Sequence, residues 1–410
     1  MRGWTTGNEL ELLENGEEFF PSVFDAIRAA RDEVLIETFI LAEDGVGRDL
    51  VRVVVAAARR GVRVRLKVDG YGCPGFSSEF LADLTAANIR IESFDPQPTK
   101  FRIRTNLLCR LHRKIVIVDR QLAFVGGINF SDVHLRSFGP ESAQDYAVRV
   151  KGPIVEQIHA YCAYGADVPQ GAPRRRWRYW VRRLPREMTH PRNEAQVLFA
   201  VRDNHRHTTD IETLYRIGIR NAKRRIMLAN AYFFPGYWFV RELARAARRG
   251  VDVRLIMQGK PDRPVTVAVA SIVYADLIAA GVKIFRYTER PLHAKVAVID
   301  DHWATIGSSN LDPVSLGLNL EANLFILDMQ LNATLRQNLE RLMERSCQPV
   351  MLDVEAPSGL WRRVLVTIAY HLTRHMSSWG RRLRDGQRFH PLETGCAASS
   401  ERDDAPVRTQ

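Results

Sequence analysis

LHRKIVIVD at residues 111–119 and LHAKVAVID at residues 292–300 show that this chain contains the same unit twice. In each stretch a histidine and a lysine, two positions apart, precede a run of mainly β-branched apolar residues that ends in an aspartate. Such a run is typical of a buried strand, and a spacing of two residues puts both polar side chains on one face of it. We therefore expect His112 with Lys114, and His293 with Lys295, to occupy equivalent strands.

The sequence around the two stretches repeats as well. In each half an apolar, β-rich run leads to a helical pattern that ends in Ala-Arg-Arg-Gly, and a second β-rich run follows. These runs cover residues 34–40, 62–68, 225–233 and 251–256. Gly61 and Gly250 are predicted to be helix C-caps. Strands that alternate with helices indicate βαβ crossovers, so we predict an α/β fold of two similar halves, each a mainly parallel sheet flanked by helices.

Composition changes along the chain mark its predicted parts. The first half is expected over residues 1–168 and the second over residues 193–350. Between them, residues 169–192 form a basic, aromatic linker that contains the run RRRWRYW. Residues 351–410 mix apolar and basic residues at near-helical spacing and are predicted to be an amphipathic tail whose end is disordered.

Charge and cysteine content narrow the functional class. The chain has 59 Lys and Arg against 47 Asp and Glu, a net charge of +12, which favours an anionic partner. Its five cysteines include no C-x-x-C pair, which argues against a disulfide framework and against a zinc site. The acidic N-terminus is unlike a signal peptide, and no apolar stretch reaches the roughly 18 residues that span a bilayer. We expect a protein that is not secreted and that contacts membranes peripherally.

Each half also carries a Gly/Asn segment, and each histidine lies 17 residues before the asparagine of that segment, Asn129 or Asn310. This set suits phosphodiester chemistry, because an imidazole can attack phosphorus while lysine and asparagine donors hold the charged oxygens. The second histidine can act as general acid and then as general base. Small residues at Gly127 and Ser308 would let the backbone approach the phosphate.

A single His-x-Lys pair is more often a strand histidine beside a solvated lysine than a catalytic motif. Two complete copies at matched spacing make the catalytic interpretation the better one. Asp119 and Asp300 complete the catalytic motif, but a turn residue after a strand would look the same. We favour an orienting or structural role for these two carboxylates.

The paired motifs resemble the phospholipase D superfamily, and within it the bacterial cardiolipin synthases, especially their B type. The resemblance covers nearly the whole chain. Unlike the type with two N-terminal transmembrane helices, this chain begins directly at the catalytic repeat. The segments that carry the resemblance are residues 13–17, 37–39, 69–72, 104–106, 230–236, 301–305 and 319–323.

The resemblance implies two halves packed with pseudo-twofold symmetry around one active site, and a double displacement that needs no metal or cofactor. One phosphatidylglycerol is attacked, glycerol leaves, and a second phosphatidylglycerol takes the phosphatidyl group to give cardiolipin. By analogy His112 is the nucleophile and His293 the general acid/base, although the sequence itself is symmetric. Glu37 and Glu321 are expected to hydrogen-bond the histidines; a structural ion pair is the equally weighted alternative.

The resemblance implies a peripheral protein on the cytoplasmic side of the bacterial inner membrane, with anionic phospholipid rather than nucleic acid as its partner. Residues 174–183 and 361–382 combine basic and aromatic side chains suited to such a surface. A hydrolase or nuclease of the same superfamily remains an alternative, because no motif excludes water as acceptor. A non-catalytic basic binding module is the third. Neither the oligomeric state nor the preferred lipid follows from the sequence.

Overall fold

The computed structural model describes residues 3–73, 75–94, 109–164, 194–259, 274–350 and 389–391. The predicted linker and nearly all of the predicted tail lie outside these residues, as do the two basic, aromatic segments expected to meet a membrane. The described strands form two eight-stranded sheets, one in each half of the chain apart from one short strand near the C-terminus. In the part of the chain that is described, no helix has both the length and the apolar character needed to cross a bilayer.

The first sheet places the strand that follows the first motif near its centre. Its strand order is β1 (Glu9–Glu14), β7 (Tyr146–Lys151), β6 (Leu122–Gly126), β5 (Ile115–Val118), β2 (Glu33–Thr38), β3 (Arg63–Asp69), β4 (Arg90–Phe94) and β16 (Phe389–Pro391). β5 lies antiparallel to β2, with Glu37 opposite Ile115. The start of β5 therefore lies at the carboxyl end of β2, where ligand sites of α/β sheets are usually found.

The second sheet has the same order when its strands are read from β8 back to β15. It runs β15 (Cys347–Pro349), β11 (Lys283–Tyr287), β10 (Asp252–Gln258), β9 (Arg225–Asn230), β12 (Lys295–Ile299), β13 (Trp303–Gly307), β14 (Glu321–Leu327) and β8 (Gln196–Arg202). β12, which begins at Lys295 of the second motif, again lies antiparallel to the first strand of a βαβ pair, β9. The predicted duplication is confirmed by this matching strand order.

The prediction of mainly parallel sheets was wrong, because each sheet is mixed. In the described strands only β2–β3–β4 and β9–β10–β11 run parallel, and the other pairs are antiparallel. Parallel pairing requires a crossover connection, and helices supply it only early in each half. After each motif the chain turns back directly: Asp119 and Asp300, both with φ of 51°, open the tight turns into β6 and β13.

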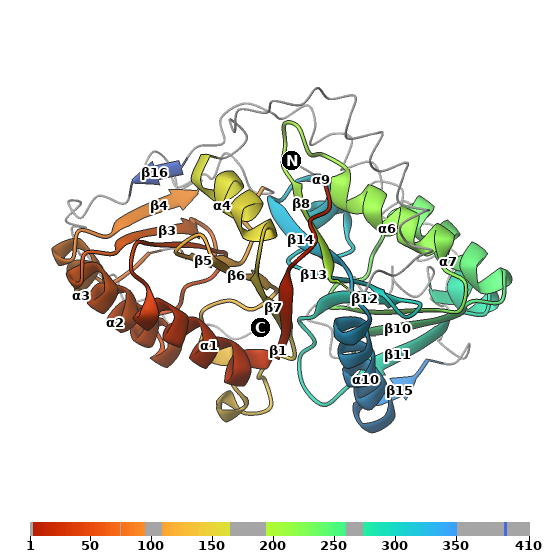
Figure 1. The fold of residues 1–410 in the computed structure, drawn as a ribbon. Helices are drawn as coiled ribbons and strands as arrows, with labels where there is room; N and C mark the ends of the chain where they lie inside the picture. The colour runs from red at the N-terminus through yellow and green to blue at the C-terminus, as the bar shows by residue number, and fades with distance from the viewer. Residues whose placement is uncertain are drawn as a thin grey trace.

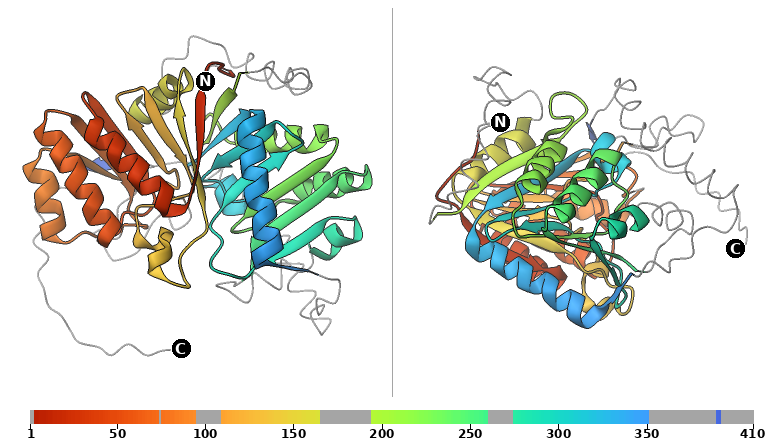
Figure 2. Two further views of the ribbon diagram at one scale, coloured as in Figure 1. Left: turned by 60° about the horizontal axis from the view of Figure 1, so that its bottom comes forward. Right: turned by 90° about the vertical axis from the view of Figure 1, so that its right-hand side faces the viewer.

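Helices cover both faces of each sheet (Figure 1). On the outer faces, α1 to α3 pack on the first sheet and α6 and α7 on the second, which forms two separate apolar cores. α4 and α10 lie between the sheets and share a third core with strands from both halves. Figure 2 shows α10 alongside β1 of the other half. The helices span α1 (Asn15–Ala29), α2 (Gly45–Arg59), α3 (Ser78–Ala86), α4 (Ile154–Tyr164), α6 (Asp210–Asn221), α7 (Tyr237–Arg248), α9 (Pro313–Gly317) and α10 (Met329–Ser346).

The two predicted helix C-caps are confirmed. Gly61 and Gly250 follow α2 and α7 with φ values of 93° and 90°, the left-handed conformation of a helix C-cap.

The two halves are joined reciprocally, because Leu111 forms a β-bridge with Leu320 while Leu292 forms one with Gln144. Each bridge lies one residue before a motif histidine, so the shared core brings the two motifs to one interface between the halves.

Candidate active site

Both motif histidines lie just before a strand rather than on it, which corrects the sequence prediction. β5 begins at Ile115, after His112 and Lys114, and β12 begins at Lys295, after His293. The preceding residues leave their own sheet to bond with the other half: His112 N–H donates to Leu320 O at 3.0 Å, and His293 N–H donates to Gln144 O at 2.8 Å. The histidines are therefore positioned by the interface.

A carboxylate from the second half holds His112. Glu321, the first residue of β14 and fully buried, lies with its Oε2 3.0 Å from His112 Nδ1. The same oxygen accepts a hydrogen bond from Ser308 Oγ at 2.5 Å. Burial alone would raise the pKa of Glu321, but His112, Lys114 and Ser308 more than offset it and lower that pKa. Glu321 is thus an anion that fixes the His112 proton on Nδ1 and leaves Nε2 free.

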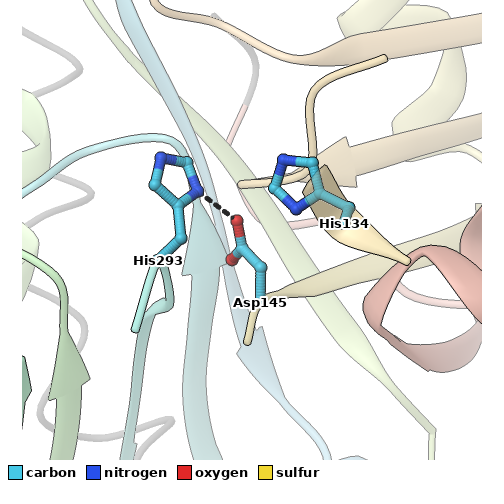
Figure 3. A group of neighbouring side chains, drawn as sticks. All are labelled: His134, Asp145 and His293. Carbon is cyan, nitrogen blue, oxygen red and sulfur yellow. Dashed lines mark hydrogen bonds and ion pairs between the residues drawn. The ribbon is translucent and has the colours of Figure 1, made fainter. Parts of the chain in front are cut away.

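A carboxylate from the first half holds His293 in the same way. Asp145, immediately before β7 and fully buried, lies with its Oδ2 2.6 Å from His293 Nδ1 (Figure 3). Asp145 Oδ1 accepts from the backbone N–H of Tyr146 at 2.8 Å. Burial, together with the ammonium groups of Lys295 and Lys114, lowers the pKa of His293 well below its usual value. Each histidine is therefore oriented by a carboxylate from the opposite half.

The motif lysines lie in the same buried region. Burial lowers the pKa of Lys114 to about 7 and that of Lys295 to about 8. Lys114 Nζ donates to the backbone carbonyl of His112 at 2.8 Å, and Lys295 Nζ donates to that of His293. An ammonium ion has three donors, so each lysine can still donate to an anion. Two buried cations of this kind create a strong preference for a phosphate group.

The two predicted asparagines are buried and differ in their contacts. Asn129 accepts a hydrogen bond from Ile40 N–H through its Oδ1 at 3.2 Å, which directs its amide N–H groups the other way. Asn310 has a buried Oδ1 without a hydrogen-bond partner in the structure. Buried amide donors of this kind suit the oxygens of a phosphodiester.

The small residues Gly127 and Ser308 serve the carboxylates, and no phosphate contact needs to be invoked for them. A Cβ atom on Gly127 would lie 2.4 Å from Asp145 Oδ1, so any side chain there would displace Asp145. At the matching position of the second half, Ser308 donates to Glu321 and accepts from Ala322 N–H at 3.0 Å. The longer glutamate and the serine fit together, as do the shorter aspartate and the glycine.

Asp119 and Asp300 lie away from this region, at the far end of the strand that follows each motif. Seven residues of extended chain separate each from its histidine, roughly 20 Å. Asp119 accepts backbone N–H groups from Arg31, Asp32 and Glu33 at 2.9, 2.8 and 3.0 Å. Asp300 binds the corresponding N–H groups of residues 223–225. These backbone contacts support the structural role favoured from the sequence.

Glu37 and Glu321 proved to differ. Glu321 bonds a histidine as expected, whereas Glu37 forms buried ion pairs with Arg113, at 2.8 Å, and Lys67, at 3.3 Å. For Glu37 the alternative interpretation, a structural ion pair, is the one the structure supports. Arg113 stands between His112 and Lys114 in the first motif, where the second motif has Ala294, so only the first half needs this counter-ion.

Sequence reasoning missed Asp145 and a neighbouring histidine, His134. Asp145 is the counterpart of Glu321, but it lies 16 residues after Asn129 whereas Glu321 lies 11 residues after Asn310. Short 3₁₀ turns, η1 (Asp132–His134) and η2 (Arg136–Phe138), occupy this stretch of the first half and hide the correspondence. The correspondence between Asp145 and Glu321 shows in the structure, where each follows a β-bridge between the halves.

His134, Asp145 and His293 are the one group of potential metal ligands among the residues that the structure describes, with ligand atoms within 4.8 Å of one another. Hydrogen bonds already use most of these atoms. His293 Nδ1 bonds Asp145, and His134 Nε2 accepts from Asn129 N–H at 3.1 Å. A cation would have to break the His293–Asp145 bond, so the donor set fits a hydrogen-bonded network better than a resident metal.

Comparison with known proteins identifies the family of this site. A family model described as "Cardiolipin synthase, PLD-like domain" matches residues 23–163 and 215–343, and both matches contain one of the motifs. The chain belongs to the PLD-like cardiolipin synthase family. It is 47% identical over 372 residues to cardiolipin synthase B of Escherichia coli, covering 91% of this chain and 89% of that one. It is 32% identical over 348 residues to cardiolipin synthase A of Pseudomonas putida, covering 82% of this chain and 69% of that one.

The fold has a solved counterpart. A phosphatidylserine synthase from Haemophilus influenzae superposes with a TM-score of 0.66 at 12% identity, over 90% of this chain and 94% of that one. This likeness shows that the two chains share one fold. The superfamily and family predicted from the paired motifs are therefore confirmed for this cardiolipin synthase family member.

Proposed function

We propose that this protein makes cardiolipin by transferring a phosphatidyl group from one phosphatidylglycerol to another, with glycerol as the second product. The observation that carries the proposal is the pair of histidines, each oriented by a buried carboxylate of the opposite half, beside two buried lysines. The name of the 47%-identical relative, cardiolipin synthase B, supports the choice of substrate.

In the first step, Nε2 of one histidine attacks phosphorus, the bond from phosphorus to the glycerol oxygen breaks, and the other histidine gives its proton to that oxygen. In the second step, the histidine that gave the proton takes a proton from the incoming hydroxyl. The hydroxyl oxygen attacks phosphorus, and the bond from phosphorus to the nucleophilic histidine breaks. The ammonium groups of Lys114 and Lys295 and the amides of Asn129 and Asn310 hold the phosphate oxygens in both steps. No metal or cofactor takes part in this scheme.

Differences between the two histidines support His112 as nucleophile and His293 as acid/base. The His112 side chain is 11% exposed and the His293 side chain 26% exposed. A proton carrier must exchange protons with alcohols arriving from outside, whereas a covalent intermediate benefits from shielding against water. The negative charge of a bound phosphodiester raises the pKa of His293, so His293 acquires its proton together with the substrate.

We further propose that the enzyme binds the membrane surface peripherally, on the cytoplasmic side. Tyr71, 52% exposed, follows the carboxyl end of β3, and Tyr232, 46% exposed, follows that of β9. Aromatic side chains of this kind favour the interface between lipid head groups and acyl chains. Their position at the ends of the strands near the motifs fits a rim that rests on the bilayer while lipid enters.

The overall reaction is tested by incubating the protein with phosphatidylglycerol vesicles in the presence of a chelator and separating the lipid products. Cardiolipin and glycerol in equal amounts are expected from the wild type and neither from His112→Ala. Phosphatidic acid as the main product would make the protein a hydrolase instead. Cleavage of nucleic acid but of no lipid would identify a nuclease.

The assignment of the two histidines is tested with a phosphatidyl ester of p-nitrophenol, a leaving group that departs without a proton. We expect His293→Ala to release one equivalent of nitrophenol in a burst and to carry a phosphatidyl group on His112, detectable by mass spectrometry. His112→Ala should give no burst. The reverse pattern would exchange the two roles.

A further inference from the structure

We propose that His134 is a positioning residue that acts through the Asp145 carboxylate on His293, tying the acid/base to the phosphate-binding segment at Asn129. The proposal extends the function proposed above and rests on it. His134 belongs to neither motif. Its ring lies beside the Asp145 carboxylate, on the side opposite His293, with a ring nitrogen turned toward the carboxylate (Figure 3).

Hydrogen bonding fixes where the His134 proton is. Nε2 accepts a hydrogen bond from the backbone N–H of Asn129 at 3.1 Å, and a backbone amide can only donate. Burial lowers the pKa of His134 to about 3, so the ring is neutral at physiological pH and its one proton is on Nδ1. Nδ1 is buried and has no hydrogen-bond partner in the structure. The ring therefore directs an otherwise unused N–H donor into the His293–Asp145 group.

The turn that carries His134 is rigidly held. Asp132 accepts the N–H groups of Gly45 and Val46 at 3.1 and 2.8 Å, which anchors η1 to the start of α2. In return, Asp44 accepts from Asp132 N–H at 2.7 Å and from Ser131 Oγ at 2.8 Å. A ring held this firmly can impose an orientation on its neighbours.

The second half supports Glu321 differently. Ser308 donates directly to Glu321, while the first half has Gly127 at the matching position and no hydroxyl to offer Asp145. Conversely, the second half has Ser315 where the first half has His134. Apart from its histidine, Glu321 accepts from the Ser308 hydroxyl and from the Asn319 amide, the latter at 3.4 Å, whereas for Asp145 the neighbouring donor is the imidazole N–H of His134.

A donor is useful here because burial raises the pKa of Asp145 and so favours its protonated form, which has no charge with which to hold the His293 proton. Lys295 at the start of β12 and Lys114 before β5 lower that pKa through their charges. The neutral His134 ring adds no charge, and it acts on the carboxylate only through its Nδ1–H donor. The lysine charges are partly neutralised when phosphate binds, whereas the Nδ1–H of His134 is not. The Nδ1–H of His134 is thus a donor that favours the ionised form of Asp145 both with and without bound phosphate.

Two substitutions separate the two functions of the ring. His134→Asn places an amide at the position of Nδ1 and keeps a donor toward Asp145, whereas His134→Gln places an oxygen near the position of Nε2 and keeps the acceptor for Asn129. We expect His134→Gln to lower kcat about tenfold and to leave KM unchanged. The acid limb of the kcat–pH profile should shift to higher pH. His134→Asn should stay within about threefold of wild type.

Equal activities for the two variants, or a larger loss for His134→Asn, would overturn the proposal. A double-mutant cycle gives a second check: with Asp145→Asn already present, His134→Gln should have little further effect, and additive losses would overturn the proposal. A wild-type protein that forms no cardiolipin would refute the proposed function instead. In that case the NMR titration of His293, expected to differ between the Gln and Asn variants, still tests the role of His134.

Discussion

Replacing Asp145 by asparagine exchanges one carboxylate oxygen for an amide nitrogen without changing the volume. In the wild type both oxygens accept: Oδ1 from Tyr146 N–H at 2.8 Å and Oδ2 from His293 Nδ1 at 2.6 Å. Asparagine has one acceptor for these two donors. If its oxygen faces Tyr146, its NH₂ group forces the His293 proton onto Nε2, where it blocks the base. If its oxygen faces His293, a buried backbone N–H loses its partner.

A hydrogen bond to a charged group contributes about 1.5–3 kcal/mol, so Asp145→Asn should lower kcat about 10- to 100-fold. Stability should not fall with activity. Because burial raises the pKa of Asp145, its ionised form costs stability at neutral pH, and the neutral amide removes that cost. The assay is cardiolipin formation on phosphatidylglycerol vesicles, with thermal unfolding measured in parallel.

Asp119→Asn is the matched control, since it changes the same side chain about 20 Å away. We expect it to lower the unfolding temperature, because the carboxylate binds three backbone N–H groups, and to leave kcat per folded molecule unchanged. A kcat for Asp145→Asn within about twofold of wild type would refute the reasoning, since it would mean that His293 does not depend on this carboxylate.

Three further outcomes are expected. Glu37→Gln should lower the free energy of unfolding by about 3–5 kcal/mol, because it leaves Arg113 and Lys67 underpaired in the interior. Denaturant titration measures this loss, and kcat should not change. A selective loss of kcat would instead place Glu37 in the active site. Ser308→Ala should lower kcat about tenfold, since Glu321 loses a hydroxyl donor at 2.5 Å, whereas Ser309→Ala serves as its neighbour control and should stay near wild type. KM for phosphatidylglycerol should rise from about pH 7 upward, because Lys114 and then Lys295, with pKa values lowered to about 7 and about 8, lose their charges; a KM that stays flat up to pH 10 would exclude both lysines from phosphate binding.

The duplication, the family and the motif histidines and lysines were predictable from the sequence, because they depend on residue types at fixed spacing. The sheet topology was less predictable. Helical crossovers show in the sequence as periodic segments, and they predicted the parallel strands β2–β3 and β9–β10. The three-residue turns at 119–121 and 300–302 leave little signal, so the antiparallel strands that follow them were not anticipated.

Contacts between the halves could not be predicted at all, and they decide the site. Glu321 was proposed as a partner of a histidine only by resemblance, and Asp145 was missed, because both partners come from the opposite half of the chain. Glu37 is the converse case. Glu37 lies opposite the start of β5 in the sheet, yet it forms an ion pair with Arg113, the residue after His112, and does not bond the histidine. A position next to the motif strand in the sheet is thus a poor guide to which carboxylate bonds the histidine.

The exchange of carboxylates between the halves also explains why one half would not suffice. A half-chain would contain a histidine and a lysine but not the carboxylate that orients the histidine, and the strands that supply Glu321 and Asp145 also form the shared core. Folding and assembly of the site are therefore one event. Once both halves are on one chain, the supports of the two histidines are free to diverge: Glu321 with Ser308 at one, Asp145 with Gly127 and His134 at the other. That divergence fits a reaction in which one histidine must carry the phosphatidyl group and the other must carry the proton.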